Sequence, residues 1–158
     1  MPSRAASPAA SPGASSPACA CGRLRRATRA LTQLYDDAIA PAGLHLTQFS
    51  LLRTLALRGP TRITELAAVA LLDRTALSRN LDPLVARGLV TVVAGKDART
   101  REVALSRAGH AAIRAALPHW KRAQAEVVRR LGAPKLDTLI ALLGEIESLH
   151  PGAPGRAA

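Results

Sequence analysis

Aromatic residues make up only 2% of this 158-residue sequence, which holds one Trp, one Tyr and one Phe. Because hydrophobic residues reach 48%, the core must consist mainly of Leu, Val, Ile and Ala. Leu and Ala favour helices, whereas β-rich domains usually need aromatic and β-branched side chains. The composition predicts a mostly helical fold and excludes collagen-like, disulfide-dense and wholly disordered chains.

Cysteines and long apolar runs are also scarce. The two cysteines, Cys19 and Cys21, cannot form a disulfide framework. No run approaches the roughly 20 apolar residues of a membrane span, and the N-terminus lacks the apolar stretch of a secretion signal. The acid-free segment before Asp36 only weakly imitates an organelle transit peptide. We expect a soluble protein of a reducing cytoplasm.

Acidic residues are few, with 11 Asp and Glu against 22 Lys and Arg, and the net charge is +11. All but three of the basic residues are Arg, whose planar fork suits phosphates and guanine edges. Nucleic acid is therefore the leading partner, ahead of an anionic membrane surface or an acidic protein. A high Arg content without any polyanionic partner is the remaining alternative.

Motifs of catalysis and metal binding are missing. The sequence has no Gly-rich phosphate loop, no G-x-S-x-G and no H-E-x-x-H. Cys19-Ala20-Cys21 and the four scattered histidines do not make a zinc pattern. We expect no enzyme activity, no metal and no cofactor.

The chain divides into two tails and one domain. Residues 1–20 and 151–158 are rich in Pro, Ser, Ala and Gly, which predicts flexible tails around a single domain at 21–150. Helical spacing of apolar residues and two short β-prone segments predict the order ααααββαα. Expected helix caps are Thr47, Thr61, Asp73 and Ser106, and Pro118 should kink the long helix that follows Ser106.

Helices 61–70 and 74–87 have the spacing of a helix-turn-helix, whose second helix enters the major groove of DNA. One polar stripe runs opposite the apolar face of that second helix. It consists of Arg74, Thr75, Ser78, Arg79 and Asp82, and the apolar face consists of Leu77, Leu81 and Leu84. An ordinary amphipathic helix with a solvated face is the alternative.

A hairpin turn at 95–100 follows directly and favours the DNA-binding interpretation over a plain surface hairpin. Lys96, Arg99 and Arg101 can reach phosphates or a minor groove, whose negative potential attracts Arg when the groove is narrow. Asp97 can orient the Arg99 guanidinium and so stabilise the wing.

These segments resemble the MarR family of winged-helix regulators across about residues 22–150. The resemblance is carried by Ile63-Thr64-Glu65-Leu66-Ala67, by residues 73–79 and by Gly88-Leu89-Val90. Its most specific part is Asp97-Ala98-Arg99-Thr100-Arg101 with Leu105-Ser106 and Gly109, which is similar to the family's wing signature.

The resemblance implies an α+β, mostly α fold, with a winged helix-turn-helix lobe at about 47–106 and a helical dimerisation layer at about 21–40 and 107–150. It also implies a homodimeric repressor that binds a pseudo-palindromic operator. By position, Arg74, Thr75, Ser78 and Arg79 would contact bases and phosphates, and Arg99 would enter the minor groove. Pro83 departs from a regular recognition helix and puts the contacts after it in doubt.

Apolar stripes on 24–38, 113–131 and 139–149 independently favour a dimer, since exposed stripes of that length usually mark an interface. The alternative is that these helices cover one another within one chain.

Regulation is expected from one of two sources. The family resemblance implies release from DNA by a small aromatic acid, with His45, Gln48, Phe49 and Trp120 as candidate wall residues; each of them can equally be an ordinary core or loop residue. Cys19 and Cys21 offer a thiol switch instead, because nearby Arg side chains and a helix N-terminus make thiols more reactive. A ligand-independent architectural DNA-binding protein and a winged helix used for protein contacts are the rival classes.

Overall fold

The computed structural model describes residues 19–95 and 100–150. Its helices are α1 (Ala20–Ile39), α2 (Leu46–Arg58), α3 (Ile63–Val69), α4 (Arg74–Ala86), α5 (Arg107–Leu131) and α6 (Ala133–Glu147), with a 3₁₀ turn η1 (Ala40–Ala42). Its strands are β1 (Thr61–Arg62), β2 (Val90–Ala94) and β3 (Arg101–Leu105). The expected tails lie outside the described residues except for 19 and 20, and Ala20 already begins α1.

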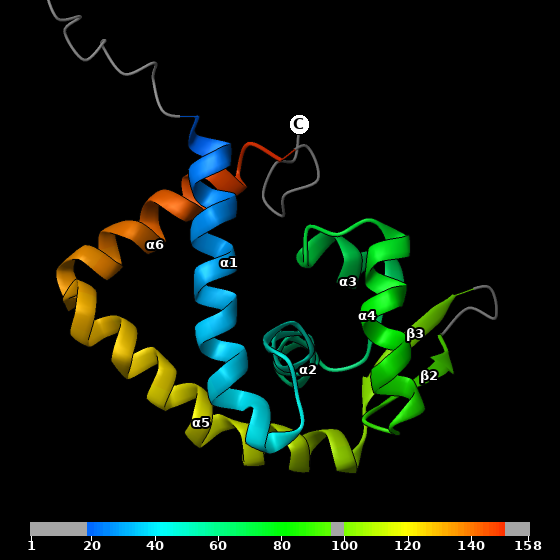
Figure 1. Cartoon of the computed structure of the whole chain (residues 1–158). Coiled ribbons are helices and arrows are strands. Elements are labelled where there is room, and N and C mark those ends of the chain that lie inside the picture. Colours follow the sequence, from blue (N-terminus) through cyan, green and yellow to red (C-terminus); the bar gives the residue numbers. More distant parts are fainter. Residues whose placement is uncertain (1–18, 96–99, 151–158) are drawn as a thin grey trace, which may run out of the picture.

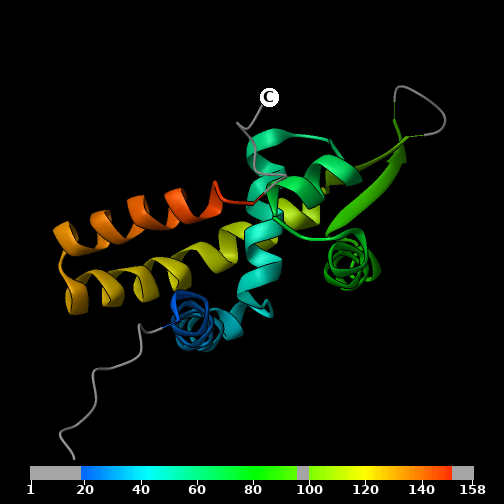
Figure 2. The same cartoon turned by 90° about the horizontal axis from the view of Figure 1, so that it is seen from above.

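The helices form two groups joined by α2 and α5. Helices α1, α5 and α6 make a long arm, and α3, α4 and the hairpin of β2 and β3 make a separate lobe (Figure 1). Figure 2 shows α6 folding back along the second half of α5, which it contacts. The mostly helical fold and its winged helix-turn-helix are confirmed.

Strand β3 lies at the centre of a three-stranded antiparallel sheet of order β1-β3-β2. In the hairpin, Val92 pairs with Val103 and Ala94 with Arg101. On the other side of β3, Thr61 pairs with Val103 and Arg62 with Glu102. The sequence predicted the hairpin but not β1, because two residues are too few to show a strand period.

The expected cap at Thr61 is wrong, because Thr61 lies in β1 and not at the start of a helix. Thr61 is 3% exposed, and its hydroxyl donates to the Gly59 carbonyl at 2.9 Å. Helix α3 begins two residues later, after Arg62, which makes no side-chain capping bond.

The expected cap at Thr47 is also wrong, because α2 begins one residue earlier and His45 holds the N-cap position. The free N–H groups of this turn find other acceptors. The His45 N–H donates to Gln48 Oε1 at 3.1 Å, and the Leu46 N–H donates to Asp36 Oδ1 at 2.5 Å.

The other two caps are confirmed. Asp73 Oδ1 accepts the Ala76 N–H at 2.8 Å at the start of α4, and Ser106 Oγ accepts the Gly109 N–H at 3.0 Å at the start of α5. Each satisfies a backbone donor that the first helical turn leaves without a partner.

The core is aliphatic, as the composition predicted. Fully buried side chains come from all the described helices except α6 and from the sheet, and Phe49 is the one aromatic residue of the described chain among them. Leu77, Leu81 and Leu84 are at most 4% exposed, so the apolar face of α4 is confirmed.

The two prolines in the interiors of α4 and α5 are accommodated within continuous helices. Helix α4 runs through Pro83 to Ala86, so its last turn is retained. Helix α5 runs through Pro118 and changes direction along its length (Figure 1). Among the described helices, none has the length and apolar character to cross a membrane.

A tight junction joins the end of α4 to the start of α5. Gly88 has a φ of +66°, a left-handed conformation that favours glycine, and the chain then turns into β2. A Cβ on Gly109 would lie 2.2 Å from the Leu89 carbonyl oxygen and 2.6 Å from Leu105 Cδ1. Gly109 is therefore required by close approach of the backbone rather than by its own dihedral angles.

Substitution of Gly109 tests this junction. Gly109→Ala should lower the free energy of unfolding by about 1–3 kcal/mol, because the added methyl group overlaps a backbone carbonyl. The matched control is Gly144→Ala in α6, where a Cβ meets nothing within 4 Å. Gly144→Ala should raise the free energy of unfolding by about 0.5–1 kcal/mol, as expected for Ala in place of Gly inside a helix. Urea unfolding followed by circular dichroism measures both, and equal effects would refute the close approach.

Candidate nucleic-acid interface

Helix α4 presents the polar stripe that its sequence predicted. Arg74, Thr75, Arg79 and Asp82 are exposed and Ser78 is half-buried, while the opposite leucines are buried. Asn80 donates from its side chain to the Ala76 carbonyl at 2.8 Å and so faces its own helix. The cap at Asp73 and the buried leucines therefore fix which side chains point outward.

The hairpin places a second basic element beside α4. The Gly95 N–H donates to the Thr100 carbonyl at 2.8 Å and closes the base of the turn, and the exposed Arg101 begins β3. Lys96, Asp97 and Arg99 lie outside the described residues, so their expected contacts remain predictions.

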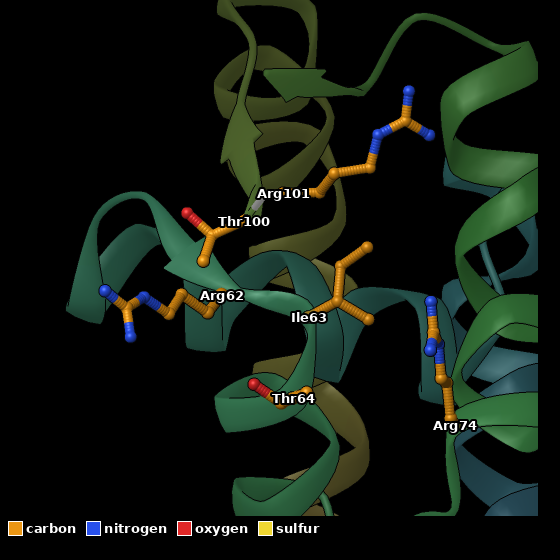
Figure 3. Close-up of a pocket in the computed structure, with 6 residues that line it drawn as sticks. All are labelled: Arg62, Ile63, Thr64, Arg74, Thr100 and Arg101. Carbon is orange, nitrogen blue, oxygen red and sulfur yellow. The ribbon is translucent and has the colours of Figure 1, made fainter. Parts of the chain in front are cut away.

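A pocket of about 250 Å³ lies where β1, α3, α4 and β3 meet, and three arginines contribute to its lining. It is lined by Arg62, Ile63, Thr64, Arg74, Thr100 and Arg101. Figure 3 shows Arg74 and Arg101 on one side of Ile63, and Arg62 on the other side near Thr100. Among the described residues, none of these three arginines is in an ion pair, since the pairs present join Asp36 to His45 and Glu126 to Arg129 and Arg130.

The sequence had singled out Arg74 and Arg101 but not Arg62. Arg62 reaches the pocket because β1 pairs with β3, and that pairing joins residues about forty positions apart. The only local hint of this strand is the β-branched Thr61 after Pro60, which does not show where the strand pairs.

The chain's three aromatic residues gather in one cluster at the junction of α1, α2 and α5. The Trp120 ring centroid lies 6.3 Å from that of Tyr35 and 6.3 Å from that of Phe49. The Arg53 guanidinium carbon lies 4.8 Å from the Trp120 centroid, which is cation–π distance. The Tyr35 hydroxyl donates to Gln124 Oε1, and burial raises the pKa of Tyr35.

The four candidate ligand residues occupy two places. Phe49 and Trp120 belong to the aromatic cluster, where Phe49 is only 1% exposed. His45 and Gln48 lie at the start of α2, and His45 Nδ1 is 3.6 Å from Asp36 Oδ2. The residues between these two, Leu46 and Thr47, line a pocket of about 320 Å³ that also reaches Asn80 of α4.

The cysteines lie at the beginning of α1, and both are free and exposed. Cys21 lines a groove of about 670 Å³ between α1 and α6, with Arg25, Arg29, Ile146 and Leu149 among the other lining residues. In the described part of the chain, no three His, Cys, Asp or Glu side chains are placed to hold a metal ion.

A sequence model of the MarR family matches residues 42–100, which include the helix-turn-helix and the hairpin. The M. tuberculosis transcriptional regulator MosR, solved in complex with DNA, is 43% identical to this chain. The match covers 83% of this chain and 97% of that one, with a TM-score of 0.73. This chain belongs to the MarR family.

Two further members of the MarR-type fold were solved on DNA. A mutant of E. coli MarR complexed with operator DNA is 26% identical, over 81% of this chain and 94% of that one, with a TM-score of 0.73. The transcriptional repressor CouR, bound to a 23-mer duplex, is also 26% identical, over 80% of this chain and 91% of that one, with a TM-score of 0.74. A comparison with curated protein sequences gave no match.

This member of the MarR family is therefore a DNA-binding transcriptional regulator. The polar stripe of α4, the base of the wing and the Arg-lined pocket lie on the winged lobe, and the arm of α1, α5 and α6 lies apart from it (Figure 1).

Proposed function

We propose that this protein is a homodimeric repressor that binds a pseudo-palindromic operator and is released from it by a small aromatic or phenolic acid. The carrying observation is the exposed stripe of α4, held outward by three buried leucines and flanked by further arginines. In the proposed complex α4 enters the major groove, and the wing enters the neighbouring minor groove. The protein acts without catalysis, in the cytoplasm.

The DNA contacts divide into two kinds. Arg74, Thr75, Ser78 and Arg79 of α4 contact base edges and the nearby backbone. Lys96, Arg99 and Arg101 of the wing contact phosphates and the minor groove, and Asp97 orients Arg99. The net charge of +11 supports the electrostatic part of this binding.

The apolar surface of the arm supports a dimer. Leu142 and Ile146 are 49% and 42% exposed on α6, four residues apart and so on one face, and Leu149 just beyond the helix is 72% exposed. Leu31 of α1 is 38% exposed. A single chain leaves these side chains in water, and a second copy would cover them.

Two features support an acidic aromatic effector. Arg53 over Trp120 places a cation beside an aromatic surface at the junction of the two groups of helices. The pocket at the start of α2 has the size of a small-molecule site and touches both α2 and α4. A ligand bound between these helices would bias the position of α4, which is what release from DNA requires.

Cys19 and Cys21 carry the second candidate function, a thiol-based redox switch. Both thiols are free and exposed two residues apart, and Cys21 faces the α1–α6 groove beside the proposed dimer surface. Oxidation there would change the packing of the arm.

The base-reading prediction separates a sequence-specific regulator from an architectural DNA-binding protein. Arg79→Ala should cost about 1–3 kcal/mol of binding and relax the preference at one base pair of each half-site. Arg99→Ala should weaken binding to all sequences more evenly and flatten the salt dependence by about one unit per subunit. Selection from a random duplex pool, followed by titration at several salt concentrations, measures both. A parent protein that enriches no sequence would favour the architectural alternative.

The dimer prediction uses the α6 surface. Replacing Leu142 and Ile146 together by Glu should convert a dimer at micromolar concentration into a monomer, because two charges cannot be buried in an apolar interface. Leu57→Glu is the control, since Leu57 is 82% exposed on α2, outside the arm. Sedimentation velocity gives the masses. A parent that is monomeric on its operator would refute the dimer.

The release prediction compares the two proposed switches in one assay. We expect a panel of hydroxybenzoates to dissociate the selected operator from the parent and from a Cys19→Ser, Cys21→Ser double variant alike. We expect hydrogen peroxide to act equally on both proteins. Fluorescence anisotropy of labelled operator gives the affinities. A peroxide effect that the double variant loses would favour the thiol switch instead.

A further inference from the structure

The Arg-lined pocket joins the two elements that the proposed function places in different grooves. Arg74 is the first residue of α4, and Arg101 is the first residue of β3 at the base of the wing. Both line the same pocket, with Arg62 and two threonines (Figure 3). The major and minor grooves of a duplex are separated by one sugar–phosphate strand. A duplex that receives α4 in one groove and the wing in the next must therefore carry that strand past this pocket.

We propose that the pocket binds a backbone phosphate of this strand, and that Arg62 is a DNA-contacting residue. The inference rests on the proposed placement of α4 and the wing in neighbouring grooves. Its result is a fixed register between the two elements, because Arg62 on one side of Ile63 and Arg74 and Arg101 on the other contact the same strand (Figure 3).

The chemistry of the lining suits a phosphodiester. Three guanidinium groups supply permanent positive charge and many N–H donors, and Thr64 and Thr100 add hydroxyl groups. The exposed Arg62, Arg74 and Arg101 have no ion-pair partner in residues 19–95 and 100–150. Ile63 lies between the arginines as an apolar surface, which suits a deoxyribose.

The position of Arg62 is set by backbone pairing rather than by its side chain. Arg62 pairs with Glu102 through the β1–β3 ladder. Truncation of the side chain therefore leaves the ladder in place, and Arg62→Ala should fold as the parent does. Thermal unfolding checks this before any binding measurement.

The test removes single phosphate charges from the DNA. A duplex selected by the full-length parent is prepared with one uncharged methylphosphonate at a time along each half-site. We expect a methylphosphonate at one position of each half-site to lower the affinity of the parent for the duplex about tenfold, which is the effect of losing charged hydrogen bonds. Arg62→Ala should bind the unmodified duplex about tenfold more weakly and be insensitive to that one position. Arg114→Ala, an exposed arginine on α5 with the same charge change, should keep the full sensitivity.

Three results would overturn the inference. In the first, Arg62→Ala retains every methylphosphonate effect of the parent. In the second, Arg62→Ala and Arg114→Ala reduce the salt slope on a random duplex equally, although loss of a phosphate contact predicts a fall of about 0.9 per subunit for Arg62→Ala alone. In the third, the parent binds pyrophosphate saturably and Arg62→Ala does not, while no methylphosphonate position loses its effect in Arg62→Ala. That result would assign the pocket to a phosphorylated small molecule.

Failure of this inference is distinguishable from failure of the proposed function. Sequence enrichment from the random pool and its loss in Arg79→Ala depend on base contacts. The methylphosphonate coupling depends on the pocket. A parent that enriches an operator but shows no coupled phosphate retains the proposed function without the proposed role of Arg62.

Discussion

The junction between Gly88-Leu89 and Ser106–Gly109 is the constraint on which the arrangement of the two groups of helices depends. The Ser106 N–H donates to the Leu89 carbonyl at 3.1 Å, and the Ser106 hydroxyl donates to the Gly88 carbonyl at 2.6 Å. The same hydroxyl oxygen caps α5 through Gly109. One serine thus ties the end of α4, the start of the wing and the start of α5 together. Gly109 permits the close approach because it has no Cβ.

A second tie connects the winged lobe to the segment between α1 and α2. Arg87, directly after α4, donates to the Gly43 carbonyl at 2.7 Å, between η1 and α2. Asp36 of α1 holds the start of α2 through the Leu46 N–H. A shift of α2 relative to α1 would therefore be transmitted to α4. The aromatic cluster of Tyr35, Phe49 and Trp120 lies at this same crossing of α1, α2 and α5.

Several parts of the fold and of the site were predictable because their signals are local. Asp73 and Ser106 precede apolar periodic runs and act as caps, as expected from their short side chains. Leu77 and Leu84 repeat at helical spacing and are buried, so the outward direction of Arg74 and Arg79 followed from the sequence. Thr47 and Thr61 failed as caps although they are equally good residue types. At the first turn Asp36 accepts the Leu46 N–H, and at the second Thr61 pairs with Val103 of β3. Both partners lie outside the turns themselves.

The sequence by itself determined the helical class, the polar stripe of α4, the hairpin and the excess of positive charge. Each of these depends on side-chain type and spacing over a few residues. Only the tertiary structure decided that Arg62 joins Arg74 and Arg101 in one pocket, that three isolated aromatic residues meet, and that Cys21 faces α6. Those groupings arise from long-range strand pairing and helix packing. Such contacts join residues whose separation along the chain carries no periodic signal.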